Sequence, residues 1–236
     1  MILLIINRFL AKCLAVSYTN EGQHLQAYAT LKRWIAFKYP DVASSSVYNP
    51  PDSTTYPSLE LHSHVSSLFL DAVRRSASSM KPHQVDPDVQ VGLGLLFYAI
   101  DDYDKAVDCF TSALSVRPDD HILWNRLGAT LANSGRSEEA LEAYRKALEI
   151  KPSFVRALYN LGVGCINIGC YQEAVEYLLS ALSLHGPRNG GNQVNISDNL
   201  WTTLRRAFSL MDRSDLVQKV DNSDEVDSFR EEFKFE

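Results

Sequence analysis

The sequence predicts an all-α fold, a solenoid of stacked helical repeats that ends in a C-terminal helical segment. Two observations support this prediction. The chain of 236 residues resembles itself at an offset of 34 residues, a period typical of paired-helix repeats. The columns that recur hold glycine and alanine, which suit places where two helices approach closely.

The recurring columns define three tandem units, which begin at Pro87, His121 and Val155. Position 7 is leucine, position 8 is glycine, and positions 20 and 27 are alanine in each unit. We expect bulky residues at positions 4, 7, 11 and 24 to fill the space between one helix pair and the next. Gly135 and Gly169 mark the turn inside a pair, and Pro118 and Pro152, at position 32 of the first two units, follow the second helix.

This pattern resembles the tetratricopeptide repeat, and the middle unit matches it nearly completely. An earlier, degenerate unit begins near Arg8, with Trp34 in a column where the other units have alanine. The expected organisation is a degenerate first repeat (1–40), a linker loop and connecting helix (41–85), three tandem repeats (86–186), and a loop, C-terminal helix and frayed tail (187–236). Within these, the loop runs from Asp41 to about His62, the connecting helix covers about 63–79, Ser197 caps the C-terminal helix, and fraying starts at Asp221.

Composition argues against several classes of function. The net charge of −6 disfavours a broad nucleic-acid surface, and no apolar stretch is long enough for membrane insertion. The four cysteines form no CxxC pair or zinc-type cluster, so we expect reduced, mostly buried thiols. No catalytic constellation or phosphate-binding loop is present, which predicts a protein without cofactors that is not an enzyme. The pairs Asp101-Asp102 and Asp119-Asp120 are expected at turns and helix caps.

In a solenoid, the first helix of each pair lines the concave groove. The groove positions carry five asparagines and one arginine: Asn20, Asn125, Asn133, Asn160, Asn167 and Arg156. An asparagine amide offers donors and acceptors without a charge to desolvate, which suits an extended peptide backbone. An arginine nearby can attract a terminal carboxylate, and Ala129 leaves room for an apolar side chain. The groove chemistry predicts capture of an extended C-terminal tail.

Other interpretations stay open for individual residues. Asn20, Asn133 and Asn167 lie near helix ends, where asparagine also serves as a C-cap. Asn125 and Asn160 lie in mid-helix, where asparagine has poor helix propensity and no capping role, so they favour a functional interpretation. Arg156 alone would be an ordinary solvated arginine.

Several segments resemble the peroxisomal targeting-signal-1 receptor family. They are Asp86–Phe97, Tyr103–Pro118, Leu123-Trp-Asn-Arg-Leu-Gly-Ala-Thr-Leu-Ala-Asn133, Tyr159-Asn-Leu-Gly-Val-Gly-Cys-Ile-Asn167 and Asn199–Arg205. The resemblance runs from about Leu14 to about Ser214. It implies that the asparagines matching Asn20, Asn125, Asn160 and Asn167, with Arg156, hold the peptide backbone and carboxylate. It adds Asn133, Arg126 (commonly lysine in relatives), Val16, Thr19 and Glu21 to the contact region, with Glu21 facing a basic residue of the cargo.

The resemblance also implies partners and location. The family binds cargo proteins ending in Ser-Lys-Leu or a similar tripeptide, is cytoplasmic and cycles to the peroxisomal membrane, where a full-length form meets docking proteins. Relatives carry two more repeats and a long disordered N-terminal half, so the chain looks N-terminally truncated. The alternative is a co-chaperone adaptor or scaffold. A clamp for acidic chaperone tails needs polar groove residues where Val91, Leu95 and Ile122 stand, which argues against the co-chaperone.

Overall fold

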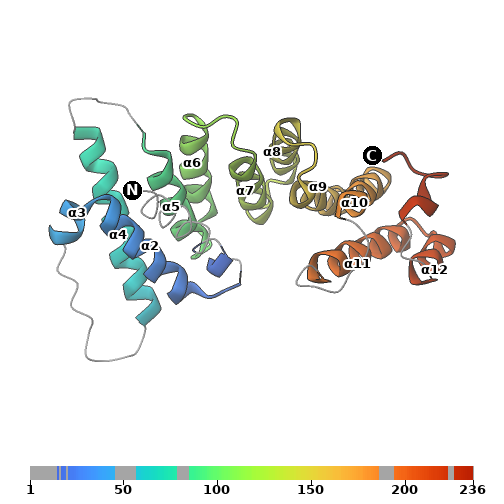
Figure 1. The fold of residues 1–236 in the computed structure, drawn as a ribbon, viewed down its shortest axis with the longest axis horizontal. Coiled ribbons are helices and arrows are strands. Elements are labelled where there is room, and N and C mark those ends of the chain that lie inside the picture. The colour runs from blue at the N-terminus through green and yellow to red at the C-terminus, as the bar shows by residue number, and fades with distance from the viewer. Residues whose placement is uncertain are drawn as a thin grey trace. The chain divides into compact units, whose positions relative to one another are not determined.

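Helices account for the regular elements throughout the part of the chain that the structure describes. The computed structural model describes residues 15, 17–19, 21–45, 57–78, 85–185, 194–222 and 226–235 (Figure 1). The all-α prediction is confirmed. The chain divides into two compact units, Met1–Pro118 and Asp119–Glu236, and each is described by itself. Among the described helices, none has both the length and the apolar character that crossing a membrane requires.

The predicted unit starts Pro87, His121 and Val155 are the first residues of α5, α7 and α9. The first unit contains α2 (His24–Lys38), α3 (Pro40–Ser45), α4 (Pro57–Ser78), α5 (Pro87–Tyr98) and α6 (Tyr103–Leu114). The second contains α7 (His121–Asn133), α8 (Ser137–Ile150), α9 (Val155–Asn167), α10 (Tyr171–His185), α11 (Val194–Leu210), α12 (Ser214–Asn222) and the 3-10 helix η1 (Val226–Phe229).

A left-handed residue closes the turn inside each repeat. Gly135 and Gly169 have φ of +81° and +84°, as the sequence predicts. Gly22 of the degenerate unit (φ +70°) and Asp101 of the first tandem unit (φ +59°) occupy the same column. Glycine adopts this conformation without the steric cost that a Cβ adds. The shared geometry supports the assignment of residues before 40 to a repeat.

The glycine at position 8 receives a large side chain from the second helix of its own pair. A Cβ on Gly128 would lie 2.6 Å from Tyr144 Cε1, and one on Gly162 would lie 2.9 Å from Leu178 Cγ. In the first unit, a Cβ on Gly94 would lie 2.5 Å from Phe110 Cε1. The residue at position 24 therefore packs inside a pair. This corrects the expectation that it fills space between pairs.

The linker prediction is wrong at both of its ends. Residues 40–45 form α3, and α4 begins at Pro57, six residues before the predicted start at Ser63; residues 46–56 lie outside the described residues. Proline is favoured at the start of a helix, because its missing N–H has no partner to lose there. His62 is therefore a helical residue of α4. Its Nε2 lies 3.0 Å from the Leu96 carbonyl oxygen in the last turn of α5.

Phe69 of α4 wedges between α2 and α5. Its ring stacks on Trp34 with centroids 5.7 Å apart, and a Cβ on Gly92 of α5 would lie 2.2 Å from Phe69 Cε1. Phe69 is fully buried. Trp34 stands where the tandem units have alanine. It packs on α4, a helix that the tandem units do not have.

Aspartates cap the N-termini of the first two tandem repeats. Asp86 Oδ1 accepts from Asp88 N at 3.0 Å, and Asp120 Oδ1 accepts from Leu123 N at 3.0 Å. Asp102 accepts from Lys105 N at 3.4 Å at the start of α6. Such bonds satisfy amide groups that have no partner within the helix. The predicted capping and turn roles of Asp101-Asp102 and of Asp120 are confirmed.

Two expectations about the C-terminal segment are wrong. Helix α11 begins at Val194, so Ser197 lies inside it and is buried instead of capping it. The tail is not frayed from Asp221, because Phe229 and Phe233 are 0% and 4% exposed. Both rings pack against Phe208 of α11, with centroid distances of 5.6 and 5.7 Å. Burial of these two aromatic rings thus holds the segment against α11, although the residues around them are charged.

Candidate peptide-binding site

Two mid-helix asparagines of successive repeats are hydrogen-bonded to each other in the second unit. Asn160 Nδ2, on α9, donates to Asn125 Oδ1, on α7, at 3.0 Å. Asn125 is only 6% exposed, whereas Asn160 is partly exposed. Both helices are the first of their pairs. The two residues that sequence reasoning weighted most for function are therefore brought together.

Packing between the repeats holds these two helices in register. Leu141 of α8 lies against Gly164 of α9, where a Cβ would come within 2.6 Å of Leu141 Cδ2. Leu127 and Leu131 of α7 and Leu161 of α9 are buried. Apolar packing thus fixes the backbones that carry Asn125 and Asn160.

The amide pair has unused hydrogen-bonding capacity after this bond. Each asparagine amide has two N–H donors and an oxygen with two lone pairs. The bond between the two residues uses one donor of Asn160 and one lone pair of Asn125. The amide of Asn125 can still donate, and the oxygen of Asn160 can still accept. A donor and an acceptor side by side are what one unit of an extended peptide backbone requires.

The predicted line along α7 continues from Asn125 at helical spacing. Ala129 and Asn133 follow at intervals of four residues, which places them on one face. Ala129 is partly exposed and Asn133 is exposed. Arg126 is also partly exposed, and its carbonyl accepts from the buried Thr130 hydroxyl at 2.9 Å. Small and polar groups thus alternate on the open side of α7.

The line along α9 has the same character. Arg156 is exposed and lies four residues before Asn160, and Asn167 is exposed at the end of the helix. Asn133 and Asn167 are the last residues of α7 and α9. The left-handed residue of each terminus comes two positions later, at a glycine. Neither asparagine therefore supplies the left-handed cap that would explain its presence.

In the first unit, the structure describes only part of the predicted contact region. Val16 and Asn20 lie outside the described residues. Thr19 is buried, and its hydroxyl donates to the Ala15 carbonyl at 2.8 Å. Glu21 is exposed in the turn before α2 and accepts from Ser17 Oγ at 2.8 Å. Its carboxylate therefore faces solvent, as contact with a cationic ligand requires.

Two of the described thiols are buried, which disfavours their reactive thiolate form. Burial raises the pKa of Cys109 to about 12 and that of Cys165 to about 11, and a thiol reacts through its thiolate. Cys109, Cys165 and Cys170 are free, and Cys13 lies outside the described residues. Within the part of the chain that the structure describes, no three His, Cys, Asp or Glu side chains come together to hold a metal ion.

Sequence reasoning missed two features, one in each unit. One is the direct bond between Asn125 and Asn160, because spacing along a helix does not reveal contacts between helices. The other is a cluster of ionised side chains on α2 and α5, centred on Asp86. Its capping role could have been recognised, since an aspartate directly before Pro87 is a strong helix-start signal.

Comparison with known proteins agrees with these features. Residues 91–153 match the family model of the tetratricopeptide repeat. The chain is 57% identical over 224 residues to the peroxisomal targeting signal receptor of Yarrowia lipolytica. It is 53% identical over 228 residues to that of Debaryomyces hansenii, and 42% identical over 236 residues to that of Saccharomyces cerevisiae. These matches cover 94 to 95% of this chain but only 37% of each relative.

Solved structures show the same fold at low sequence identity. A crystal structure of MamA has a TM-score of 0.51 and 17% identity, and the match covers 97% of this chain and 94% of that one. A mutant of MamA has a TM-score of 0.51 and 16% identity, with coverage of 92% and 90%. At this identity, the likeness concerns the helical fold alone.

Proposed function

Because the chain is a homologue of the peroxisomal targeting signal receptors over 94% of its length, we propose that it binds the C-terminal Ser-Lys-Leu-type tripeptide of cargo proteins, for import into the peroxisome matrix. The observation that carries the proposal is the hydrogen-bonded pair of Asn125 and Asn160, with Arg156 on the same helix as Asn160.

The amide pair supports recognition of a peptide backbone irrespective of its side chains. An extended strand presents N–H and C=O groups in alternation, and an asparagine row can satisfy both without charge. Because Asn125 is nearly buried, a backbone group bonded to it would be shielded from competing water. This shielding makes the hydrogen bond stronger than it would be on an open surface.

The remaining residues supply the terminal and side-chain selectivity. Arg156 attracts the terminal carboxylate directly or through water, and Asn133 and Asn167 extend the polar row. Ala129 leaves room for the last apolar side chain, and Arg126 adds positive charge beside it. For the first unit, the similarity to the receptors implies further peptide contacts from Val16, Thr19, Asn20 and Glu21, with Glu21 as the partner of the penultimate lysine.

Recognition of this kind takes place in the cytoplasm, and cycling to the peroxisomal membrane follows from the receptor role. The chain spans 37% of the length of the Yarrowia receptor. Contact with peroxisomal docking proteins is therefore proposed for a form of the relatives' length. We propose no enzymatic role, since the residues of the candidate site in the second unit are four asparagines, two arginines and an alanine.

The proposal is tested by titrating the purified chain with a fluorescent peptide that ends in Ser-Lys-Leu. The free acid should bind measurably, and the C-terminally amidated peptide should bind at least about tenfold more weakly, because a charge-assisted bond contributes about 1.5–3 kcal/mol. A peptide with the same composition in scrambled order serves as the control. Equal binding of acid and amide would refute capture of the terminus.

A further inference from the structure

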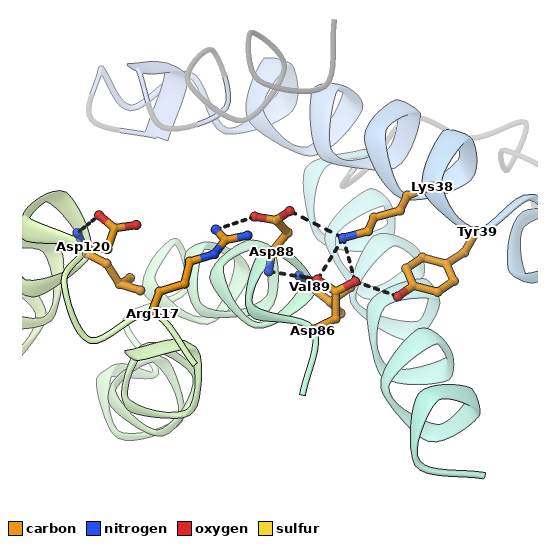
Figure 2. A network of polar contacts seen from close by, with 8 residues as sticks. Lys38, Tyr39, Asp86, Asp88, Val89, Arg117 and Asp120 are labelled. Carbon is orange, nitrogen blue, oxygen red and sulfur yellow. Dashed lines mark hydrogen bonds and ion pairs between the residues drawn. The ribbon is translucent and has the colours of Figure 1, made fainter. Parts of the chain in front are cut away.

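A cluster of charged groups joins the end of α2 to the start of α5 in the first unit (Figure 2). Lys38 Nζ lies 2.8 Å from Asp86 Oδ1 and 2.6 Å from Asp86 Oδ2. The Tyr39 hydroxyl donates to Asp86 Oδ2 at 2.7 Å. One carboxylate thus caps α5 and at the same time receives two side chains from the C-terminal end of α2.

The cluster continues through a second carboxylate. Asp88 Oδ2 lies 3.5 Å from Lys38 Nζ, and Asp88 Oδ1 accepts from Arg117 Nη1 at 2.8 Å. Asp88 therefore bridges Lys38 and Arg117. Both carboxylates belong to the first residues of α5 or its cap, where the positive end of the helix dipole also favours negative charge.

The apolar packing of α2 involves α4 more than α5. Helix α2 rests mainly on α4, through Trp34 on Phe69 and Tyr28 on His62. Helix α4 in turn rests on α5, through Phe69 on Gly92. Apolar contacts between α2 and α5 are therefore largely indirect. The charged cluster links the two helices directly, at the end of α2 farthest from Glu21.

We propose that Lys38, Tyr39, Asp86, Asp88 and Arg117 form a salt-sensitive latch that positions α2 against α5. Helix α2 has 15 residues, so the latch acts about 22 Å from the turn that carries Glu21. Rotation of α2 about the Phe69 contact would carry that turn with it. Lys38 is thus a positioning residue for the predicted peptide contacts of the first unit, a consequence that rests on the proposed function.

The charged side chains of the latch are neither fully buried nor fully exposed. The side chains of Lys38, Asp86 and Asp88 are 19 to 20% exposed, whereas that of Arg117 is 40% exposed. Partial burial makes such pairs stronger than exposed ones, which contribute little. Access of water and ions at Arg117 still allows added salt to screen them.

The test is amide hydrogen exchange of the whole chain without peptide. Lys38→Met removes the charge but keeps an aliphatic stem over the Trp34 ring, which lies 5.2 Å from Lys38 Nζ. We expect exchange in residues 24–38 to accelerate about tenfold, the factor that a loss of about 1.4 kcal/mol produces. Lys38→Arg should restore protection. Raising salt from 50 mM to 500 mM should accelerate exchange in the parent chain and leave Lys38→Met unchanged.

The matched control is Lys146→Met, which removes the exposed pair with Glu149 in α8 and should leave residues 24–38 unaffected. Unchanged exchange of α2 in Lys38→Met, or acceleration that Lys38→Arg fails to reverse, would overturn the latch. Peptide titration is a separate arm, in which Lys38→Met should weaken binding two- to fivefold. If no variant binds peptide but exchange responds as expected, the latch stands and the proposed function fails.

Discussion

Asn160 Nδ2 donates to Asn125 Oδ1 at 3.0 Å, so that the two amides most suited to a peptide backbone are partners of each other in the free protein. This bond has an energetic consequence for binding. It holds both amides in one orientation and thereby reduces the rotamer entropy that a ligand would otherwise have to remove. It also couples the two residues, so their contributions to affinity cannot be independent.

Asn160→Ala should weaken binding of the Ser-Lys-Leu peptide about tenfold or more, because a hydrogen bond to a charged or buried partner contributes about 1.5–3 kcal/mol. In a double-mutant cycle, the loss on adding Asn125→Ala should be smaller in the Asn160→Ala background than in the parent chain. Peptide titration measures the affinities, and thermal unfolding provides the control. Additive losses, or a large fall in melting temperature with unchanged affinity, would assign the pair a structural role only.

Gly128→Ala and Gly135→Ala should both lower the free energy of unfolding, the first through a steric clash and the second through backbone strain. At Gly128, the added Cβ would lie 2.6 Å from Tyr144 Cε1 and 3.1 Å from the Ala140 carbonyl oxygen. We expect a loss of about 2–3 kcal/mol there, since overpacking forces the helices apart. At Gly135 nothing lies within 4 Å, but φ is +81°, so the cost should be about 1–2 kcal/mol.

Urea unfolding monitored by helical circular dichroism measures both losses. In a Tyr144→Ala background, the cost of Gly128→Ala should shrink and that of Gly135→Ala should persist. An undiminished cost at Gly128 would show that contact with Tyr144 is not its cause.

Glu21→Gln should reduce the preference for lysine over an uncharged residue at the penultimate position of the peptide. The change should be about two- to fivefold, because exposed ion pairs contribute about 0–1 kcal/mol. It should also fade as salt is added. Competition between peptides ending in Ser-Lys-Leu and Ser-Gln-Leu at low salt provides the measurement. A preference that survives the substitution intact would remove Glu21 from the contact region.

The latch should also give the first unit a dependence on pH through Asp86. Burial acts to raise the pKa of Asp86, but hydrogen bonds from Lys38 and Tyr39 and the charge of Lys38 outweigh it, so the pKa lies below its ordinary value. A lowered folded-state pKa contributes stability that is present above the unfolded pKa of about 3.9 and is lost as pH falls through the folded value.

Asp86→Asn keeps a capping side chain but not the charge. Exchange protection of residues 24–38, corrected for the intrinsic rate, should therefore differ between the parent chain and Asp86→Asn at pH 6. The two should converge as pH falls below about 4, the ordinary range of an aspartate. A difference that is constant across this range would mean that ionisation of Asp86 does not contribute.

Phe229→Ala should release the C-terminal segment. The ring is fully buried and stacks on Phe208, and truncation of a buried phenylalanine costs about 3–5 kcal/mol. The Phe233 amide, which donates to the Phe229 carbonyl at 3.0 Å, should lose its exchange protection. Phe235→Ala is the control, since that ring is partly exposed and its loss should change protection little.

The tandem repeats could be predicted from sequence because their requirements are local and recur. Glycine at position 8, alanine at positions 20 and 27 and a left-handed residue in the turn are imposed in each unit by the same backbone geometry. Contacts that occur only once lack such repetition. The wedge of Phe69 against Gly92 and the salt bridge between Lys38 and Asp86 join residues far apart in sequence, and neither has a periodic signal.

At the helix boundaries that were predicted wrongly, the sequence carries signals for two different structures. Serines and prolines before Pro57 suggest a loop, although proline also begins helices. At the C-terminus, charges around Phe229 and Phe233 suggest a solvated tail, yet both rings are buried against Phe208 of α11. For the candidate site, sequence identified the asparagines of α7 and α9. The direct bond between them depends on packing of the two helices, which no single-helix pattern encodes.

The recurrence of one left-handed turn has a practical consequence for protein engineering. Gly135 and Gly169 end equivalent turns that are one period apart, and each has a similar φ. Residues 136–169 therefore begin and end at matching backbone conformations and carry a complete second helix and the first helix of the following pair. A tandem duplication of this segment should splice into the chain without a new linker, and would create an array with an additional copy of the Asn160 helix.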